Sequence, residues 1–232
     1  MICPRCGGRA VVVDSRTYPT GEVRRRRKCR RCGHRFSTLE AVVKFEAFTV
    51  QVRRNDMLTG NEIKLQVAAG RIVIQPFDEE NIGPNSYDVH LSDELLAYTE
   101  AVLDPRKDNR YWTFKIPSEG LVLEPGRVYL GKTVEYTESP YHIPMYEGRS
   151  SLGRLGVFSH VSAGFGDIGF RGNWTLEFSV VQPVRIYPGL RIGQLYWHNP
   201  DGEVLKRYDG KYQGQTAATP SRLFQDREWE EE

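Results

Sequence analysis

Four cysteines near the start of the chain have the spacing of a metal site. They stand in two Cys-x-x-Cys pairs, "CPRC" and "CRRC", and a glycine follows each pair. Two such pairs can supply four thiolates to one tetrahedral Zn²⁺, and the glycines let the backbone turn so that its N–H groups face the sulfurs. Because four thiolates leave no position open for water, we expect a structural zinc ion with the ligands Cys3, Cys6, Cys29 and Cys32.

A second candidate site lies in the segment "GRSSLGRLG", residues 148–156. Arg149 and Arg154 offer forked guanidinium donors. Ser150 and Ser151 add hydroxyls, and the glycines let backbone N–H groups come close to a ligand, a combination that suits a polyanion such as a triphosphate. Serine and glycine also populate ordinary turns, and arginine often lies solvated at a surface, so composition alone leaves both interpretations open.

The bulk composition favours a globular protein of the cytoplasm. The chain has 232 residues, of which 39% are hydrophobic and 11% aromatic, and this permits a real core. No apolar run approaches the roughly 20 residues that span a bilayer, and the first residues lack a signal-peptide pattern, so no membrane partner is expected. In a reducing compartment, paired cysteines favour metal ligation over disulfides.

Charge divides the sequence into two parts. Residues 1–56 hold 14 Lys and Arg against 5 Asp and Glu, whereas the rest of the chain holds 18 against 25. This contrast indicates two modules with different partners. We expect a zinc ribbon over residues 1–46, a linker over 47–56 and a second domain over 57–232.

The ribbon is expected to form a strand, a turn and a second strand between the cysteine pairs. The turn falls at Pro19 to Gly21 within "AVVVDSRTYPTGEVRRRRKC". About 45 residues bury too little apolar surface to fold alone, so the metal must supply most of the stability. The run from Arg24 to Lys28 suits the phosphates of DNA or RNA, although a ribbon that packs on the second domain or on another protein fits the sequence as well.

The second domain reads as mainly β. Thr59 and Glu62 form a capping box ahead of a short helix that Gly70 would end. Short β-rich runs divided by glycine and proline follow: "RIVIQPF", "SYDVHL", "LVLEPGRVYLGKTVEYT", "NWTLEFSVV", "VRIYP" and "RIGQLYWH". This pattern predicts a β-barrel or a jelly-roll-like sandwich.

Residues 1 to about 40 closely resemble the zinc ribbon of the bacterial transcriptional repressor of ribonucleotide reductase genes. The likeness is carried by "CPRCGG", "VVVDSR" and "RRRRKCRRCGHRFSTLE". It implies a ribbon that binds nucleic acid. The nucleotide-sensing domain of those repressors has no counterpart in this chain.

Nearly all of residues 57–224 resembles the dCTP deaminase branch of the trimeric dUTPase superfamily. The motifs are "GPNSYDVHL", "GRSSLGRLGVFSHVSAGFGDIGFRGNWTLEF" and "KYQGQTAATPSR", in that order. The resemblance implies a homotrimer of distorted β-barrels that deaminates dCTP to dUTP and ammonia without a catalytic zinc ion. It also makes dTTP a candidate feedback inhibitor. Mg²⁺ is expected to accompany the triphosphate, held by phosphate oxygens and water.

Glu177 is the candidate general acid and base. It lies in the apolar run "TLEFSVV", where partial desolvation should raise its pKa toward the working range. The resemblance gives the same role to the glutamate of this motif, and it places Ser150 and Arg154 beside the reacting base and the phosphates. Arg149 and Ser151 would contact the phosphates. Because family sites form between chains, Arg154 is expected to reach into a neighbour's site.

The resemblance assigns further residues to the base and the sugar. The main chain of Val161, Ser162 and Ala163 would read the pyrimidine edge. Phe170 would pack on the deoxyribose and leave no room for a 2′-hydroxyl, while Asp167 would lie near the 3′-hydroxyl.

The segment "KYQGQ" corresponds in the family to a C-terminal lid over the triphosphate. Its residues Lys211, Tyr212 and Gln215 would close on the substrate, whereas the residues alone read as a polar tail. His160, in a strand-like run, is expected to be a core or interface histidine rather than a proton carrier.

One stretch departs from the family pattern. "AGFGDIGF" has Gly166 and Ile168 on either side of Asp167, where many relatives have "AGFIDPGF". Loss of a β-branched side chain is expected to loosen this turn. The "AGF" form resembles bifunctional relatives that also hydrolyse dUTP to dUMP and pyrophosphate, and this step stays open. The alternatives are a dUTPase only, or a DNA-binding regulator that senses nucleotides on an inactive deaminase fold.

Overall fold

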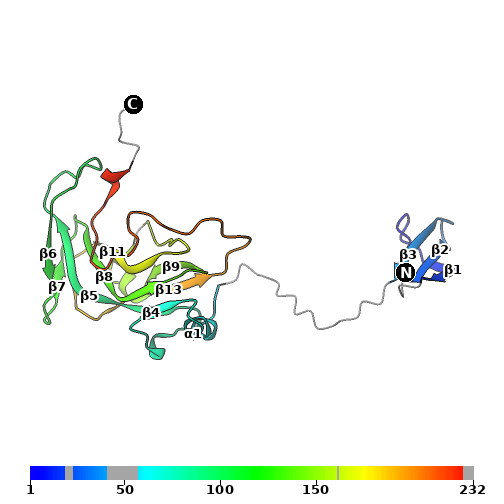
Figure 1. The fold of residues 1–232 in the computed structure, drawn as a ribbon, viewed down its shortest axis with the longest axis horizontal. Helices are drawn as coiled ribbons and strands as arrows, with labels where there is room; N and C mark the ends of the chain where they lie inside the picture. Colours follow the sequence, from blue (N-terminus) through cyan, green and yellow to red (C-terminus); the bar gives the residue numbers. More distant parts are fainter. Residues whose placement is uncertain (19–22, 41–56, 161, 227–232) are drawn as a thin grey trace. The chain divides into compact units, whose positions relative to one another are not determined.

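The computed structural model describes residues 1–18, 23–40, 57–160 and 162–226. The chain divides into two compact units, Met1–Val52 and Arg53–Glu232, and each is described by itself (Figure 1). The expected turn at Pro19 to Gly21 and the expected linker over 47–56 lie outside the described residues. No described helix is long and apolar enough to cross a membrane.

The first unit is a three-stranded antiparallel sheet. Its strands pair in the order β1 (Ala10–Thr17), β2 (Val23–Cys29) and β3 (Arg35–Glu40). The two strands expected between the cysteine pairs are confirmed, and β3 lies beyond them. Gly33 accounts for β3, because its φ of +71°, which glycine adopts without strain, reverses the chain so that Lys28 pairs with Arg35.

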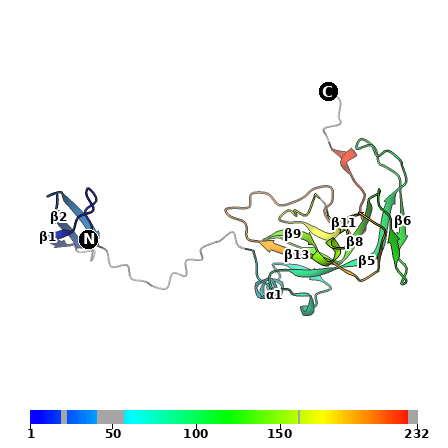
Figure 2. The same cartoon turned by 180° about the vertical axis from the view of Figure 1, so that it is seen from behind.

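The second unit is mainly β, as the sequence predicts, and its largest sheet curls toward a barrel (Figures 1 and 2). The strand order in this sheet is β10–β11–β8–β5–β13–β9, with β4 on β8 and β6 on β5, while β7 and β12 pair separately. The bounds are α1 (Gly60–Ala68), β4 (Val73–Gln75), η1 (Glu79–Asn81), β5 (Tyr87–Tyr98), β6 (Tyr111–Lys115), β7 (Leu121–Leu123), β8 (Tyr129–Glu138), β9 (Ile143–Gly148), α2 (Ser150–Gly153), β10 (Val157–Phe158), β11 (Arg171–Val180), β12 (Val184–Ile186), β13 (Arg191–His198) and η2 (Leu223–Gln225).

Alternation along β11 separates the barrel core from the face that carries the site. Leu176 and Phe178 are fully buried in the core, whereas Thr175 and Glu177 lie on the opposite face and are partly exposed. A register slip of one residue would exchange the two faces. Packing of the core therefore fixes the side of the sheet on which the Glu177 carboxylate lies.

The short helix of the second unit is confirmed. The Thr59 side chain accepts a hydrogen bond from the backbone N–H of Glu62 at the start of α1, and Gly70, with a φ of +66°, follows its end. Strands β6, β9 and β10 lie outside the predicted runs. β9 contains Pro144, which an edge strand tolerates because one side of its backbone needs no ladder partner.

Candidate active site and metal centre

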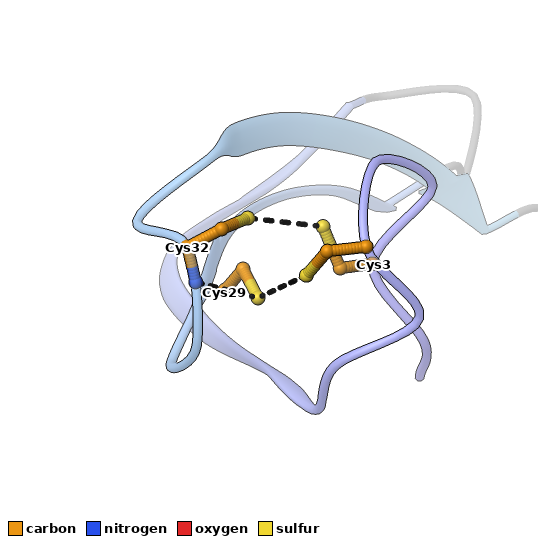
Figure 3. Close-up of side chains that lie close together, drawn as sticks. Cys3, Cys29 and Cys32 are labelled. Atoms are coloured by element: carbon orange, nitrogen blue, oxygen red, sulfur yellow. Dashed lines mark hydrogen bonds between the residues drawn. The ribbon is translucent and has the colours of Figure 1, made fainter.

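The four cysteines of the first unit converge on one point (Figure 3). Their sulfurs all lie within 4.8 Å of one another, with 3.8 Å between Cys3 Sγ and Cys32 Sγ and 3.6 Å between Cys6 Sγ and Cys29 Sγ. Zn–S bonds of about 2.3 Å place tetrahedral sulfurs about 3.8 Å apart, whereas a disulfide bond is about 2.05 Å long. The donors and their spacing therefore fit one structural zinc ion.

Backbone N–H groups prepare one of these thiols to bind metal. Cys29 Sγ accepts hydrogen bonds from the backbone N–H groups of Cys32 and Arg31, at 3.5 and 3.3 Å. The bond from Cys32 is the main cause that lowers the pKa of Cys29 to about 6. The thiolate, which is the form that ligates a metal, is therefore favoured at neutral pH.

The basic run of the ribbon is divided between two faces of the sheet. Arg27 is buried, and its Nε donates a hydrogen bond to Thr38 Oγ1 at 2.9 Å. Exposed cations alternate with it along β2, at Arg24, Arg26 and Lys28. Two further exposed cations pair with them across the sheet, Arg16 on β1 and Arg35 on β3. This exposed sheet face offers several positive charges to a polyanion.

The second unit has a pocket of about 840 Å³ over the outer face of β8 and β11. Its walls come from His160 and residues 163–170, from these strands and from the C-terminal segment 208–226. The residues indicated by the sequence that line it are Ala163, Asp167, Phe170, Glu177, Lys211, Tyr212 and Gln215. The fold thus brings together the candidate acid and base, the sugar residues and the lid, although they are far apart in the sequence.

Glu177 lies in this pocket beside His160. Glu177 Oε2 is 3.6 Å from His160 Nδ1, and the exposed fractions of the two side chains are 36% and 6%. His160 Nδ1 is buried and has no hydrogen-bond partner within the described part of the chain, while Nε2 contacts the carbonyl of Ala163. The histidine is buried, as the sequence suggests, but a buried ring nitrogen without a partner is costly, and this one faces a carboxylate.

The C-terminal segment is fastened to its own chain across the pocket. Lys211 Nζ lies 2.6 Å from Asp226 Oδ1, and Gln215 Nε2 donates a hydrogen bond to the carbonyl of Asn173 at 2.8 Å. The backbone N–H of Asn173 donates in return to the carbonyl of Gln215 at 2.9 Å. The lid lysine therefore already has a carboxylate partner, and a triphosphate would have to compete with that carboxylate for the lysine.

The donors of segment 148–156 lie outside the lining of this pocket. Within the described residues, the pocket lining includes none of Arg149, Ser150, Ser151 and Arg154. The Arg149 guanidinium is paired with Asp88, whose carboxylate also accepts a hydrogen bond from Gln194 Nε2 at 3.1 Å. The other three are exposed around α2. One chain therefore does not bring these donors to Glu177.

The segment expected to read the pyrimidine is described in part. Val161 lies outside the described residues. Ala163 lines the pocket, whereas Ser162 is exposed and is absent from the lining within the part of the chain that the structure describes.

The turn beside Asp167 is tightly packed, so the expectation that Gly166 loosens it is wrong. Gly166 is buried, and its N–H donates a hydrogen bond to the carbonyl of Pro144 at 2.9 Å. A Cβ on residue 166 would lie 2.5 Å from the Trp174 ring and 2.8 Å from the Pro144 oxygen. Close packing, rather than flexibility, accounts for the glycine.

Several pocket residues carried no usable signal in the sequence. Among them are Tyr98, Trp174, Tyr208 and Asp226. Trp174 stands in a run that the sequence correctly identifies as a strand, but strand alternation does not show which aromatic residues border a pocket. Asp226 meets Lys211 because of the path of the C-terminal segment, which has little regular structure to predict.

The fold and the pocket define a barrel-like β domain with a site for a small ligand, and comparisons with known proteins identify its family. The 2′-deoxycytidine 5′-triphosphate deaminase from Agrobacterium tumefaciens has a similar fold, with a TM-score of 0.52 and 22% identity over 63% of this chain and 49% of that chain. A family model described as dCTP deaminase-like matches residues 57–199. The chain belongs to this dCTP deaminase-like family.

Relatives at higher identity cover the same part of the chain. Proteins named "dCTP deaminase, dUMP-forming" from Hathewaya histolytica and Leptospira biflexa are 52% and 50% identical over 170 residues, which is 73% of this chain and 98% and 97% of theirs. Residues 1–40 match a second family model, described as the N-terminal domain of NrdR-like transcriptional repressors. The first unit is accordingly a zinc ribbon of this kind.

Proposed function

We propose that this protein converts dCTP to dUMP, ammonia and pyrophosphate. The relatives that share about half of its residues carry the name of a dUMP-forming dCTP deaminase, and this chain spans almost their whole length. The observation that carries the proposal is the pocket that joins Glu177 and His160 to Asp167, Phe170 and the lid.

Glu177 acts in this proposal as the proton carrier of the deamination. Its carboxylate takes a proton from the water that attacks C4 of the cytosine and delivers it to N3. It then takes the proton of the new C4 hydroxyl and passes it to the amine, which leaves as ammonia while the C4 carbonyl forms. The partly shielded position of Glu177 supports the role, since limited solvent access favours proton exchange with a bound base. His160 lies close enough to orient the carboxylate, and its free Nδ1 points to that role rather than to a purely structural one.

The rest of the pocket holds the sugar and the phosphates. Phe170 packs on the deoxyribose, and Asp167 accepts a hydrogen bond from the 3′-hydroxyl. Lys211 exchanges its partner Asp226 for the triphosphate when the lid closes over the substrate. Tyr212 and Gln215 belong to the same lid.

A Mg²⁺ ion bound to the triphosphate would supply charge neutralisation for hydrolysis of dUTP, and the protein would hold it through the phosphate groups. Among the described residues, the four cysteines are the sole group of three or more metal-ligating side chains close enough to hold an ion. The pocket therefore does not fit a dedicated magnesium cage, and phosphate oxygens and water are the expected ligands.

A second and a third copy of the chain complete the sites in a homotrimer. The phosphate donors Arg149, Ser150, Ser151 and Arg154 do not line the pocket of Glu177 in their own chain. Ser150, Ser151 and Arg154 are exposed and so can reach a neighbour's pocket, while Asp88, which accepts a hydrogen bond from Gln194, pairs with Arg149. Ring-like assembly of identical chains gives every pocket the same set of donors.

The ribbon binds nucleic acid through its exposed basic face. Its likeness to a repressor ribbon and the cations around β2 support this part of the proposal. The regulator on an inactive fold remains the second candidate function, and dTTP would then be its signal rather than a feedback inhibitor. A reducing compartment such as the cytoplasm suits the metal-ligating thiols.

Product analysis tests the proposed activity. The full-length protein is incubated with dCTP and Mg²⁺, and ammonia, dUTP, dUMP and pyrophosphate are measured separately. Equal amounts of ammonia, dUMP and pyrophosphate are expected. Ammonia with dUTP would limit the reaction to deamination, and tight dCTP or dTTP binding without ammonia would favour the regulator.

A further inference from the structure

Trp174 interrupts the regular pairing of β11 at the edge of the pocket. The register between β11 and β8 shifts between Asn173 and Thr175, and Trp174 lies in this irregularity with 6% of its surface exposed. Its indole Nε1 donates a hydrogen bond to Thr137 Oγ1 at 3.0 Å, and its backbone N–H donates to Thr133 Oγ1 at 3.0 Å. One buried hydroxyl thus fixes the indole, and a second fixes the backbone that carries it.

The indole is the central ring in a row of five. The distances between successive ring centroids are 6.1 Å for Tyr208 and Phe170, 5.5 Å for Phe170 and Trp174, 6.3 Å for Trp174 and Tyr146, and 5.3 Å for Tyr146 and His160. The row begins on the lid and ends on the histidine that faces the catalytic carboxylate. Trp174 therefore contacts Phe170, the ring expected against the deoxyribose, and Tyr146, the ring that packs on His160.

Gly166 provides the space that the indole occupies. A Cβ on this residue would come within 2.5 Å of Trp174 Cη2, the far end of a rigid and hydrogen-bonded ring. The indole cannot retreat without breaking its bond to Thr137 or pressing on Phe170 and Tyr146. The small Gly166 and the large Trp174 therefore fit together, as residues do in a close-packed core.

We propose that Trp174 and Gly166 act as a matched pair that positions Phe170 against the deoxyribose. This inference rests on the proposed function, because it assigns the pair a part in recognising a deoxynucleotide. Trp174 is a positioning residue, and it sets the discrimination between dCTP and CTP by holding the Phe170 ring where a 2′-hydroxyl would lie. Trp174 is one reason why residue 166 is glycine, and the Pro144 oxygen, 2.8 Å from the position of a Cβ, is a second.

The experiment uses full-length G166A, W174L and the G166A/W174L double variant. G164A, alone and with W174L, is the matched control, because a Cβ on Gly164 would meet the carbonyl of Tyr146 at 2.5 Å rather than the indole. The kcat, the KM and the calorimetric Kd are measured for dCTP and for CTP. Circular dichroism verifies folding, and W174F replaces W174L if the leucine variant does not fold.

The expected result is a loss of discrimination in the Trp174 variant. W174L should reduce the preference for dCTP over CTP by about tenfold, since Phe170 loses its support. In the wild-type background, G166A should reduce kcat/KM for dCTP by about tenfold. In the W174L background the reduction should be smaller by a factor of at least about three, because the clash with the indole is gone. G164A should cost the same in both backgrounds.

Two results would overturn the proposal that Trp174 and Gly166 act as a pair. One is an unchanged preference for dCTP in W174L and W174F, which would leave Trp174 a purely structural residue. The other is an equal cost of G166A in both backgrounds. A wild-type protein that binds dCTP without turnover would overturn the proposed activity, while the Kd ratio of dCTP to CTP would still test the pair.

Discussion

The ribbon and the barrel are stabilised in different ways. Among the described residues of the ribbon, the buried apolar side chains are Cys3, Ala10 and Cys29, and two of these are metal ligands. The barrel buries a continuous cluster of aliphatic and aromatic side chains that includes Trp197, Phe178 and Leu95. We therefore expect the ribbon to depend on a bound zinc ion for folding, whereas the barrel has an apolar core that needs none.

The two units also present their cations differently. In the barrel, Arg149 is paired with Asp88 and Lys211 with Asp226, so each cation is held in a defined place. On the ribbon, Arg24, Arg26 and Lys28 are exposed along one strand. Held cations suit recognition of one small polyanion in one geometry, and an exposed row suits a long phosphate backbone.

Substitution of the proposed proton carrier should have the largest effect. In E177Q, deamination should fall by about 10³-fold, because the amide cannot transfer protons, while the Kd for dCTP should stay within about tenfold. Ammonia release and calorimetry measure the two quantities, and E119Q, an exposed change outside the pocket lining, is the control. Appreciable turnover by E177Q would remove Glu177 from the mechanism.

Mixing two inactive variants should show whether the barrel site is shared between chains. E177Q and R154A are each expected to lose most of their activity. After they are unfolded and refolded together as equal parts, about a quarter of the sites should combine an intact Glu177 with an intact Arg154 from another chain. No recovery, in a mixture that has refolded into trimers, would place both residues in the same chain's site.

The comparison of the units also shows what the sequence could predict. The zinc site follows from four residues whose spacing is a local property, and strands β1 and β2 follow from the segment between the two cysteine pairs, whereas β3 lies beyond it. Glu177 and Lys211 come from distant segments, and their common pocket follows from the family motifs rather than from periodicity. The sequence therefore identified both residues as members of one site.

Other features depended on three-dimensional packing and had no local pattern. The Gly166 position was interpreted as a loosened turn because the indole that fills the space is eight residues away in the sequence. The partner of Lys211, Asp226, lies 15 residues further along a segment without regular alternation. A contact between two irregular segments leaves no periodic trace in either one.

Removal of the metal should affect one unit and spare the other. The full-length C29S/C32S variant should lose its bound zinc and the folded ribbon, because two thiolates cannot close a tetrahedral shell. Its kcat/KM for dCTP should stay within about twofold of the wild-type value. Zinc content and steady-state kinetics measure this contrast, with S37A on β3 as the control. Loss of turnover in a trimeric variant would mean that the barrel depends on the ribbon.

Neutralising the exposed ribbon cations should change the dependence of nucleic-acid binding on salt. A variant with Arg24, Arg26 and Lys28 all changed to glutamine should lower the slope of log Kobs against log salt by about 2 to 3, because about three counterion-releasing contacts are lost. Duplex DNA and RNA are titrated in parallel at several salt concentrations. An equal change after neutralising Lys64, Lys107 and Lys115 of the barrel would assign the binding to the second unit.

The smallest expected effect concerns the barrel's stability against acid, and it turns on His142. This side chain is buried, with Nδ1 3.1 Å from Asn199 Oδ1 and Nε2 3.1 Å from Gln66 Oε1. Burial lowers the pKa of His142 from its ordinary 6.5. The hydrogen bond with Asn199 and the charge of Glu62 oppose this shift, and the charge of Arg71 adds to it. The unfolded chain therefore takes up a proton more readily than the folded chain. The stabilising contribution of the neutral ring is complete above pH 6.5 and is lost as the pH falls from there through the folded-state pKa.

A glutamine at position 142 carries no titrating proton, so H142Q should flatten the fall of the melting temperature below pH 6.5 by a few degrees. Scanning calorimetry of both proteins between neutral and mildly acidic pH gives the difference curve, and groups that titrate in both proteins cancel in it. A parallel loss of stability in the two proteins would show that His142 is not a source of the acid sensitivity. A low-pH transition that follows zinc release instead would place that sensitivity in the ribbon, where protonation of thiolates competes with the metal.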